Sequence, residues 1–438
     1  MHWFDGLSKL HSFKFEGNTQ TIKFSSRFLE TNSYAAAKNN ALYLTTFFGD
    51  VEPSLNIIQR IIGFFNIDDN TNVNVFDFGD GKLCAISDHW LVNCFDKNTL
   101  SDSIMVQALL PPELPEEFNR FTIMSVAHPL KEYGTSATIT LALIISHNPF
   151  VSGTVNLIRV HSIHNRELIA SINVDRTPYM HSFALTENYA ILFADPIFIH
   201  PFSIFIKGNV VDAFEWDPEQ GTTVYIISLK DGSVEILHIP ALFHVHHVNA
   251  FEKNNGEIVV QCATHSRFDV YSDLQRDWFS NKALRKLLID IKSTFITYVI
   301  DASHTNVIRQ PVTNQLSTRL DFLTINEEYR FRENRYIYGV VPDVEYDDYA
   351  TIAIVKRDVI QGNDTVWYMP SHYPSEAIFV PKPNAVSEDD GVLLSVVLDG
   401  NRRESYLLVL DAKTMSTQAV SLTPHNIPGS FHGQFFDD

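Results

Sequence analysis

Short runs of β-branched and aromatic residues, separated by turn signals, recur along this 438-residue chain and constrain its fold more than any other feature. Clear examples are 137–146 (ATITLALIIS), 223–229 (TVYIISL), 257–263 (EIVVQCA), 351–356 (TIAIVK) and 391–399 (GVLLSVVLD). Asp-Gly pairs, which favour tight turns, stand at 80–81, 231–232, 390–391 and 399–400. The last run continues through a turn at 400–404 into SYLLVLDAK, and this pattern predicts a β-hairpin.

Many hairpins with few helical patterns predict a large all-β fold. The length suits a β-propeller better than a sandwich, and no Pro/Ser-rich linker divides the chain, so we expect a single domain over residues 1–438. The sequence has no WD or kelch period. Seven blades would average roughly 63 residues each (438/7), more than the ~40–45 of a WD40 blade, so long excursions between strands are expected.

Two segments have a helical pattern. Residues 280–291 (SNKALRKLLIDI) begin with a capping Ser280 or Asn281 and carry apolar side chains at helical spacing. Residues 53–65 (PSLNIIQRIIGFF) begin with Pro53 and are apolar on most of their surface. We expect such segments to form a cap of helices and loops over the top face of the propeller.

The balance of charges excludes some partners. Lys and Arg minus Asp and Glu gives a net charge of −19, which argues against nucleic acid and against electrostatic docking on anionic lipid. Three cysteines are few and odd in number, which favours a reducing compartment. The start of the sequence has no signal-peptide pattern, and no run of about 18 apolar residues occurs, so a cytoplasmic protein is expected.

Histidines make metal binding a candidate function, because His244, His246 and His247 lie close together among eighteen. Strand alternation would place His244 and His246 on one face and His247 on the other, without choosing between the first two. A lone histidine in a strand is usually a surface or hydrogen-bonded core residue. No closely spaced ligand pair of the zinc-protease or zinc-finger kind is present, so any metal ligands come from far apart in the sequence.

A series of short motifs covers nearly the whole chain. They are HWFDGLSKLHSFKF (2–15), SVAHPLKEYG (125–134), PYMHSFALTENYAILFADP (178–196), FEWDPEQGT (214–222), HHVNAFE (246–252), YPSEAIFVPKP (373–383), EDDGVLLSVVLD (388–399), YLLVLDAKTM (406–415) and IPGSFHGQF (427–435). In the order and joint presence of these motifs, the chain resembles the carotenoid cleavage oxygenases. These are non-heme iron enzymes that include animal carotene oxygenases and the retinoid isomerohydrolase of the visual cycle.

The resemblance implies a seven-bladed β-propeller with Fe(II) on its axis, held by four histidines. The family's motifs place these ligands at His128, His181, His246 and His432. Their separations of 53, 65 and 186 residues (181 − 128, 246 − 181, 432 − 246) agree with about one, one and three blades of roughly 63 residues. In the family's motif the ligand is the histidine three residues before an asparagine. In HHVN this is His246, so the resemblance selects His246 over its neighbours.

The resemblance also implies an activity. Enzymes of this family split one C=C bond of a polyene with O2, so we expect oxidative cleavage of a carotenoid to retinal or another apocarotenal. Two alternatives stay open: a retinyl ester isomerohydrolase that uses the same iron site, and a catalytically degenerate propeller that binds carotenoid or a protein partner.

Three carboxylates should orient the imidazoles, as glutamates do in the family. By position they are Asp88, Asp321 and Glu376, of which only Glu376 keeps the family's residue. The two aspartates are one methylene shorter, so we expect their hydrogen bonds to histidine to be long or water-bridged. The segment HWFDG lies well inside the family's usual chain, which predicts that the N-terminal segment of the family is absent.

Carotenoids reside in bilayers, so an apolar mouth is expected where substrate enters, in contact with a membrane surface. The segments 53–65 and 195–208 are the candidates for this patch. The residues that we expect to form it are Ile57, Ile58, Ile61, Ile62, Phe64, Phe198, Phe202 and Phe205.

Overall fold

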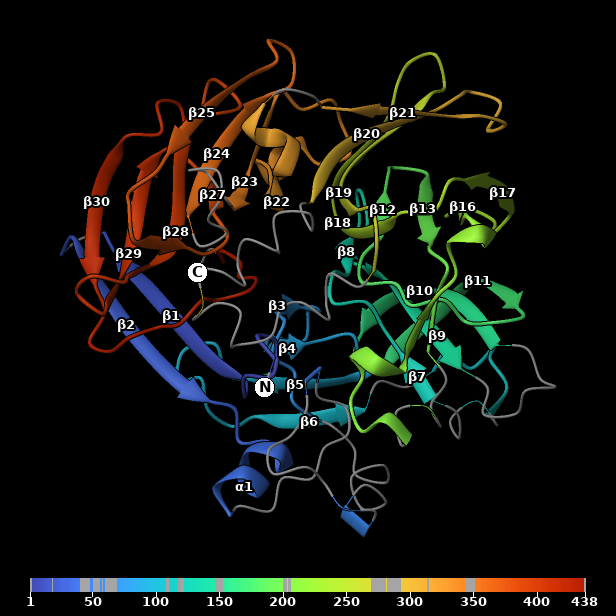
Figure 1. Cartoon of the computed structure of the whole chain (residues 1–438), viewed down its shortest axis with the longest axis horizontal. Helices are drawn as coiled ribbons and strands as arrows, with labels where there is room; N and C mark the ends of the chain where they lie inside the picture. The colour runs from blue at the N-terminus through green and yellow to red at the C-terminus, as the bar shows by residue number, and fades with distance from the viewer. Residues whose placement is uncertain are drawn as a thin grey trace.

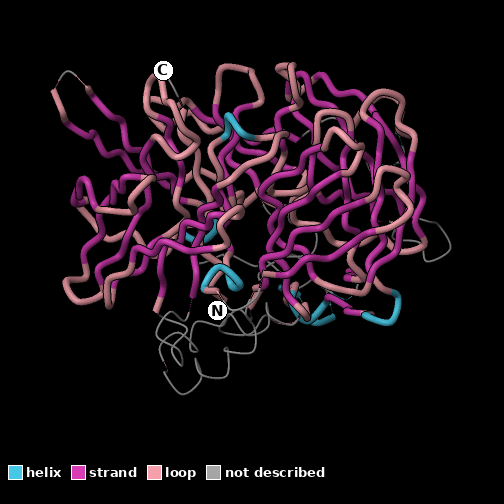
Figure 2. Tube along the Cα trace, turned by 90° about the horizontal axis from the view of Figure 1, so that it is seen from above, coloured by secondary structure: helices cyan, strands magenta, loops and turns pink. Residues whose placement is uncertain are grey.

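β-Strands dominate the structure, a computed structural model of the chain (Figure 1). The described residues are 2–17, 19–39, 48–49, 56, 58–59, 69–107, 110–116, 118, 122–145, 153–199, 203, 206–268, 281, 293–312, 315–342 and 351–436. Helices in this part of the chain are short, as the perpendicular view in Figure 2 also shows. Those whose bounds lie wholly within the described residues are α1 (Asn32–Lys38) and the 3-10 turns η2 (Val211–Ala213), η3 (Pro218–Gln220), η5 (Leu316–Arg319) and η6 (Glu327–Tyr329).

Six antiparallel sheets of four or five strands, formed by the described residues, follow one another around a ring (Figure 1). The first three contain β3 (Asn74–Asp77), β4 (Leu83–Ile86), β5 (Leu91–Phe95) and β6 (Ile104–Gln107); β7 (Thr122–Met124), β8 (Leu130–Lys131), β9 (Thr138–Ile145), β10 (Gly153–Ser162) and β11 (Asn165–Val174); and β12 (Ala184–Leu185), β13 (Tyr189–Ala194), β16 (Thr222–Ser228) and β17 (Val234–Ile239). The other three contain β18 (Phe243–Glu252), β19 (Ile258–His265), β20 (Thr294–Ile300) and β21 (Val307–Pro311); β22 (Asp321–Thr324), β23 (Tyr336–Pro342), β24 (Ile352–Asp358) and β25 (Asn363–Trp367); and β26 (His372–Pro374), β27 (Ile378–Pro381), β28 (Gly391–Asp399), β29 (Glu404–Asp411) and β30 (Thr417–Leu422). Two-stranded sheets are formed by β1 (Lys9–Glu16) with β2 (Thr21–Phe28), and by β14 (Ile197–Ile199) with β15 (Phe214–Trp216).

The all-β propeller is confirmed, but the predicted number of seven blades is wrong. Among the described residues, the strands between the sheet of β26–β30 and the sheet of β3–β6 are those of the hairpin β1–β2 (Figure 1). The segment after β30 approaches β1, with Lys9 Nζ 3.4 Å from His425 Nε2, but it forms no strand there. Pro424 and Pro428 interrupt this segment. Because proline lacks the N–H donor that a ladder needs, the segment is poorly suited to extend the hairpin into a full blade.

Apolar layers between successive sheets hold the ring together. β9 is buried along its whole length, and Leu141 and Leu192 belong to one cluster that joins the second and third sheets. Similar clusters lie between the other pairs, such as the one containing Ile226 and Val260. Burial of such side chains stabilises the fold by about 25 cal/mol per Å² of apolar surface removed from water. The five predicted runs are confirmed as β9, β16, β19, β24 and β28, and the predicted hairpin is β28–β29.

The two predicted helices lie almost entirely outside the described residues. Of 53–65, only residues 56, 58 and 59 are described, and of 280–291 only Asn281. The expected cap over the top face therefore stays a prediction. Among the described residues, no helix is long and apolar enough to cross a membrane.

Two of the three cysteines are paired and the third is free. Cys84 on β4 faces Cys94 on β5, and the two are joined by a disulfide. Cys262 is a buried free thiol. The reducing compartment that the low and odd cysteine count favoured stays a prediction.

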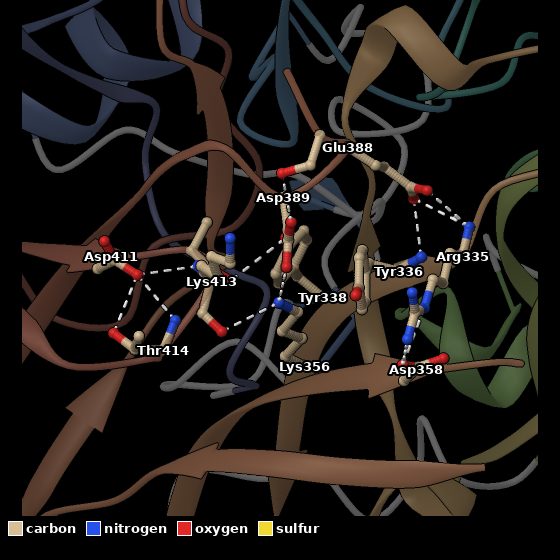
Figure 3. A network of polar contacts seen from close by, with 12 residues as sticks. Arg335, Tyr336, Tyr338, Lys356, Asp358, Glu388, Asp389, Asp411, Lys413 and Thr414 are labelled. Carbon is tan, nitrogen blue, oxygen red and sulfur yellow. Dashed lines mark hydrogen bonds and ion pairs between the residues drawn. The ribbon is translucent and has the colours of Figure 1, made fainter. Parts of the chain in front are cut away.

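A buried polar cluster joins the fifth and sixth sheets (Figure 3). Lys356 on β24 donates to Asp389 Oδ2 at 2.6 Å and to the Lys413 carbonyl at 3.2 Å, and its ammonium lies 4.0 Å from the centre of the Tyr336 ring. Next to it, Glu388 accepts hydrogen bonds from the backbone N–H groups of Arg335 and Tyr336. The cluster thus ties β23 and β24 to the loop that leads into β28.

His11 in the hairpin β1–β2 predicts a loss of stability in acid. Burial, together with the nearby charges of Lys9 and His425, lowers the pKa of His11 from 6.5 to about 4. The unfolded chain takes up this proton below about pH 6.5 while the folded chain does not, so acidification favours unfolding. Between pH 7 and pH 5 the free energy of unfolding of the parent chain should fall further than that of His11→Phe, by on the order of 1 kcal/mol. Urea denaturation of both proteins at the two pH values measures this difference. An equal pH dependence of both proteins would contradict this prediction.

Candidate metal centre

Four histidines from different parts of the ring meet near its centre. His128 follows β7, His181 precedes β12, His246 lies within β18, and His432 lies in the segment after β30. One ring nitrogen of each lies within 4.8 Å of the corresponding nitrogens of the others. The Nε2 atoms of His128 and His181 are 3.2 Å apart, and the ring centroids of His128 and His432 are 4.4 Å apart. The propeller thus brings together the four residues that the motifs singled out.

Burial favours the neutral form of two of these imidazoles, those of His128 and His246. It lowers the pKa of His128 well below its usual value, and the neighbouring imidazoles of His432 and His181 lower it further. Burial also lowers the pKa of His246, although Asp321 partly opposes this. A neutral imidazole offers a lone pair, which is the form that binds metal.

Three carboxylates contact the outward-facing nitrogens of this cluster. Asp88 accepts a hydrogen bond from His181 Nδ1 at 3.0 Å, Asp321 one from His246 Nδ1 at 2.6 Å, and Glu376 one from His432 Nδ1 at 2.8 Å. Each bond places the proton on Nδ1 and leaves the Nε2 lone pair directed inward. Asp88 comes from the first sheet, Asp321 from the fifth and Glu376 from the sixth, so all six sheets contribute to the cluster.

The expectation of long or water-bridged bonds from the two shorter carboxylates is wrong. Asp88 reaches His181 directly because its loop is held close, with the Asp88 carbonyl accepting from Ser125 N at 2.8 Å. Asp321 also reaches its histidine directly. Although burial alone would raise the pKa of Asp321, the imidazoles of His246 and His265 lower it, so the carboxylate stays ionised. His265 Nε2 lies 3.8 Å from the second oxygen of Asp321.

Phe322 belongs to this site and was not predicted. Its φ of 49° is in the left-handed region, which is rare for a bulky residue, and the β22–β23 register shifts at this point. The unusual backbone turns its ring toward the cluster, 5.4 Å from the His246 ring and 5.3 Å from the His432 ring between centroids. The sequence contains no signal for this conformation beyond the position of Phe322 next to Asp321.

The predicted arrangement of His244, His246 and His247 is wrong in one respect. His244 and His247 share a face of β18, with ring centroids 6.1 Å apart and planes within 11° of parallel. The cause is a β-bulge at Val245: His244 pairs with Thr264, but His246 already pairs with Ala263. One extra residue inverts the alternation. His246 therefore faces the cluster without His244.

The other two histidines of β18 make hydrogen bonds of their own. His244 contacts Asp195 Oδ1 at 2.8 Å through Nδ1 and the Tyr298 hydroxyl at 3.0 Å through Nε2. His247 Nδ1 lies 2.7 Å from Ser182 Oγ. Both rings also pack against Phe193. They form a buried polar network between the third and fourth sheets, separate from the four-histidine cluster.

The donor set fits a transition metal. His246 Nε2 is buried and has no hydrogen-bond partner, a costly state for a polar atom unless another group satisfies it. Imidazole nitrogens suit Zn, Cu, Fe or Ni, and three of these four imidazoles have carboxylate partners on their other nitrogen, as metal-binding histidines usually do. The four residues could hold one metal ion.

The residues expected at the apolar mouth are only partly described. Phe198 is buried in β14 beneath the guanidinium of Arg176, which lies 3.9 Å from its ring centre, so its predicted place in an exposed patch is wrong. β14 pairs with β15, and this pairing draws Phe198 into the core. Ile58 is 65% exposed. The others, Ile57, Ile61, Ile62, Phe64, Phe202 and Phe205, lie outside the described residues.

Comparison with known sequences finds one matching family model and similar proteins that are described as carotenoid-cleaving dioxygenases. A family model described as retinal pigment epithelial membrane protein matches residues 1–437. The mitochondrial carotenoid-cleaving dioxygenase of Macaca fascicularis is 26% identical, over 99% of this chain and 86% of that protein. Carotenoid cleavage dioxygenase 8 of Arabidopsis thaliana, a chloroplast protein, is 25% identical, over 99% of this chain and 77% of that protein.

Solved structures show the same fold. A single-residue variant of the Synechocystis apocarotenoid oxygenase aligns with a TM-score of 0.81 at 22% identity, over 98% of this chain and 87% of that one. The cobalt-substituted form of the Synechocystis enzyme aligns with a TM-score of 0.80 at 21% identity, over 98% and 87% of the two chains.

Proposed function

This chain belongs to the retinal pigment epithelial membrane protein family, that of the carotenoid cleavage oxygenases, and on that premise we propose that it is a non-heme iron enzyme that cleaves a carotenoid with O2. The reaction breaks one C=C bond of the polyene and forms two C=O bonds, so that both atoms of one O2 molecule enter the two carbonyl products. The expected product is retinal or another apocarotenal.

The observation that carries the proposal is the group of four histidines on the axis of the propeller. Their donor nitrogens lie within 4.8 Å of one another, and His246 Nε2 is buried without a partner. Fe(II) bound there by His128, His181, His246 and His432 would supply the binding and activation of O2 beside the substrate. No carboxylate is needed among the ligands.

The chain's own residues orient this centre. Asp88, Asp321 and Glu376 each accept an Nδ1–H and so keep three imidazoles turned with Nε2 inward. The Gly433 N–H donates to the second oxygen of Glu376 at 3.1 Å, which holds this carboxylate on the segment that carries His432. The Phe322 ring, beside His246 and His432, limits the space available to water and to a polyene. We also propose that residues 1–438 form one domain. Contact with a membrane surface is proposed for the segment around Ile58, an exposed apolar residue.

Product analysis tests the proposal. We expect the purified chain, reconstituted with Fe(II) without oxygen, to bind about one iron and then to consume one O2 for each β-carotene or lutein bond converted to aldehydes. O2 uptake by electrode and product identity by chromatography are the measurements. Release of a retinol isomer from retinyl ester without O2 uptake would instead identify an isomerohydrolase. A chain that takes up almost no iron under these conditions would overturn the enzyme assignment.

A further inference from the structure

Asp88 is the most heavily shared acceptor around the histidine cluster. Its Oδ1 accepts the backbone N–H of Ala127 at 3.0 Å, and both oxygens lie within 3.1 Å of His181 Nδ1. Its Oδ2 also accepts the hydroxyl of Tyr179 at 2.8 Å. A hydrogen bond to an ionised acceptor is stronger than one between neutral groups, so the Tyr179 hydroxyl contributes substantially to where this carboxylate lies.

Tyr179 and His181 reach Asp88 together because they stand two residues apart in an extended segment. Their side chains therefore project to the same side, while Met180 between them packs into the apolar cluster of the second and third sheets. Pro178 forms a bridge with Phe198, and the Tyr179 N–H donates to the Ile197 carbonyl at 2.8 Å. The backbone that carries the tyrosine is thus fixed to β14.

The Tyr179 ring is held as firmly as its backbone. The residue is 3% exposed and packs against Phe214 at 5.1 Å, Phe268 at 6.2 Å and Phe243 at 6.3 Å between ring centroids. A ring enclosed in this way keeps its hydroxyl at one point, so the oxygen of Asp88 that it binds is kept there too. Without the Tyr179 hydroxyl, Oδ2 of Asp88 would keep only its contact with His181 Nδ1, while Oδ1 would still accept from the Ala127 N–H.

We propose that Tyr179 is a positioning residue of the metal centre, which acts through Asp88 to hold His181 in the tautomer with the proton on Nδ1. The inference rests on the proposed function for the identity of the metal. It does not rest on that function for the contacts among Tyr179, Asp88 and His181. The shorter carboxylate at position 88 makes this second support useful, because aspartate has less reach than glutamate.

Metal titration of the full chain tests this inference with Co(II) alone, so no turnover is needed. We expect Tyr179→Phe to weaken Co(II) binding about tenfold, toward the lower end of effects seen when partners of metal ligands are removed. Tyr225→Phe is the matched control, because Tyr225 is also buried but lies on β16 in the apolar cluster of the second and third sheets, and the affinity of this variant for Co(II) should match that of the parent chain. In an Asp88→Asn background, Tyr179→Phe should cause no further loss, since the hydroxyl acts through this carboxylate. Equal losses in both backgrounds, or no loss in the parent background, would overturn the proposal.

A second measurement works without any metal. In metal-free protein with ¹⁵N-labelled histidine, the His181 resonances, assigned with His181→Gln, should report the Nδ1–H tautomer in the parent chain and a mixture of tautomers in Tyr179→Phe. A purely structural role would leave the tautomer unchanged, and that result would sink the inference. If the parent chain binds no metal, the proposed function fails while this tautomer test still decides the role of Tyr179. If it binds metal but cleaves no carotenoid, the function fails and both tests remain decisive.

Discussion

His246→Ala is expected to abolish metal binding, with a loss of affinity greater than the ~10–100-fold typical for residues that only orient a ligand. The substitution removes the one ligand that β18 supplies and leaves Asp321, which is half-buried and ionised, without the imidazole N–H at 2.6 Å. Iron content after anaerobic reconstitution and dialysis measures the effect. Loss of O2 consumption with β-carotene should accompany it.

His247→Ala provides the matched comparison, one residue along the same strand. His247 hydrogen-bonds to Ser182 and packs on Phe193, on the face shared with His244, so its loss should cost some stability while most metal affinity remains. Thermal unfolding of both metal-free variants separates stability from binding. If the two variants lost metal equally, the assignment of His246 alone to the cluster would be wrong.

β18 shows which structural features a local residue pattern can predict in this chain and which it cannot. Runs of β-branched and aromatic residues correctly predicted strands, because alternation and turn chemistry are local properties. The same alternation failed at His244, since a bulge at Val245 depends on how β18 pairs with β19, a contact that no local pattern encodes. Only the similarity to family motifs singled out His246. That similarity does not depend on which histidines share a face of the strand, so the bulge did not affect it.

Properties that depend on three-dimensional neighbours were the least predictable. The hairpin β1–β2 stands where a seventh blade was expected, because a segment interrupted by Pro424 and Pro428 adjoins it in space. Asp88 and Asp321 were expected to be too short, whereas the placement of their loops compensates for the missing methylene. The positive φ of Phe322 is likewise imposed by tertiary packing and not by a residue type that favours it.

Lys356→Met should be among the most destabilising single substitutions in the chain, costing about 3–5 kcal/mol of unfolding free energy. Methionine keeps most of the aliphatic volume but leaves Asp389 buried without its partner at 2.6 Å, since the two side chains are only 5% and 6% exposed. Although burial alone would raise the pKa of Asp389, Lys356 lowers it in the parent chain. In the variant the effect of Lys356 is lost and only weaker hydrogen bonds, such as that from Ser387, still oppose burial, so the Asp389 carboxyl should take up a proton more readily than in the parent chain.

The pH dependence and a matched pair of variants distinguish this loss of charge pairing from a packing defect. The difference in unfolding free energy between parent and Lys356→Met should be largest near pH 7 and should narrow toward pH 4, because protonation removes the unpaired charge of Asp389 in the variant. Lys382→Met removes the partner of Asp390 in an exposed pair 3.7 Å apart, and it should change stability by less than about 1 kcal/mol. Adding Asp389→Asn to Lys356→Met should restore part of the lost stability, because the buried charge is then gone. A deficit that is independent of pH and unrelieved in the double variant would show that the lysine matters for shape and not for charge.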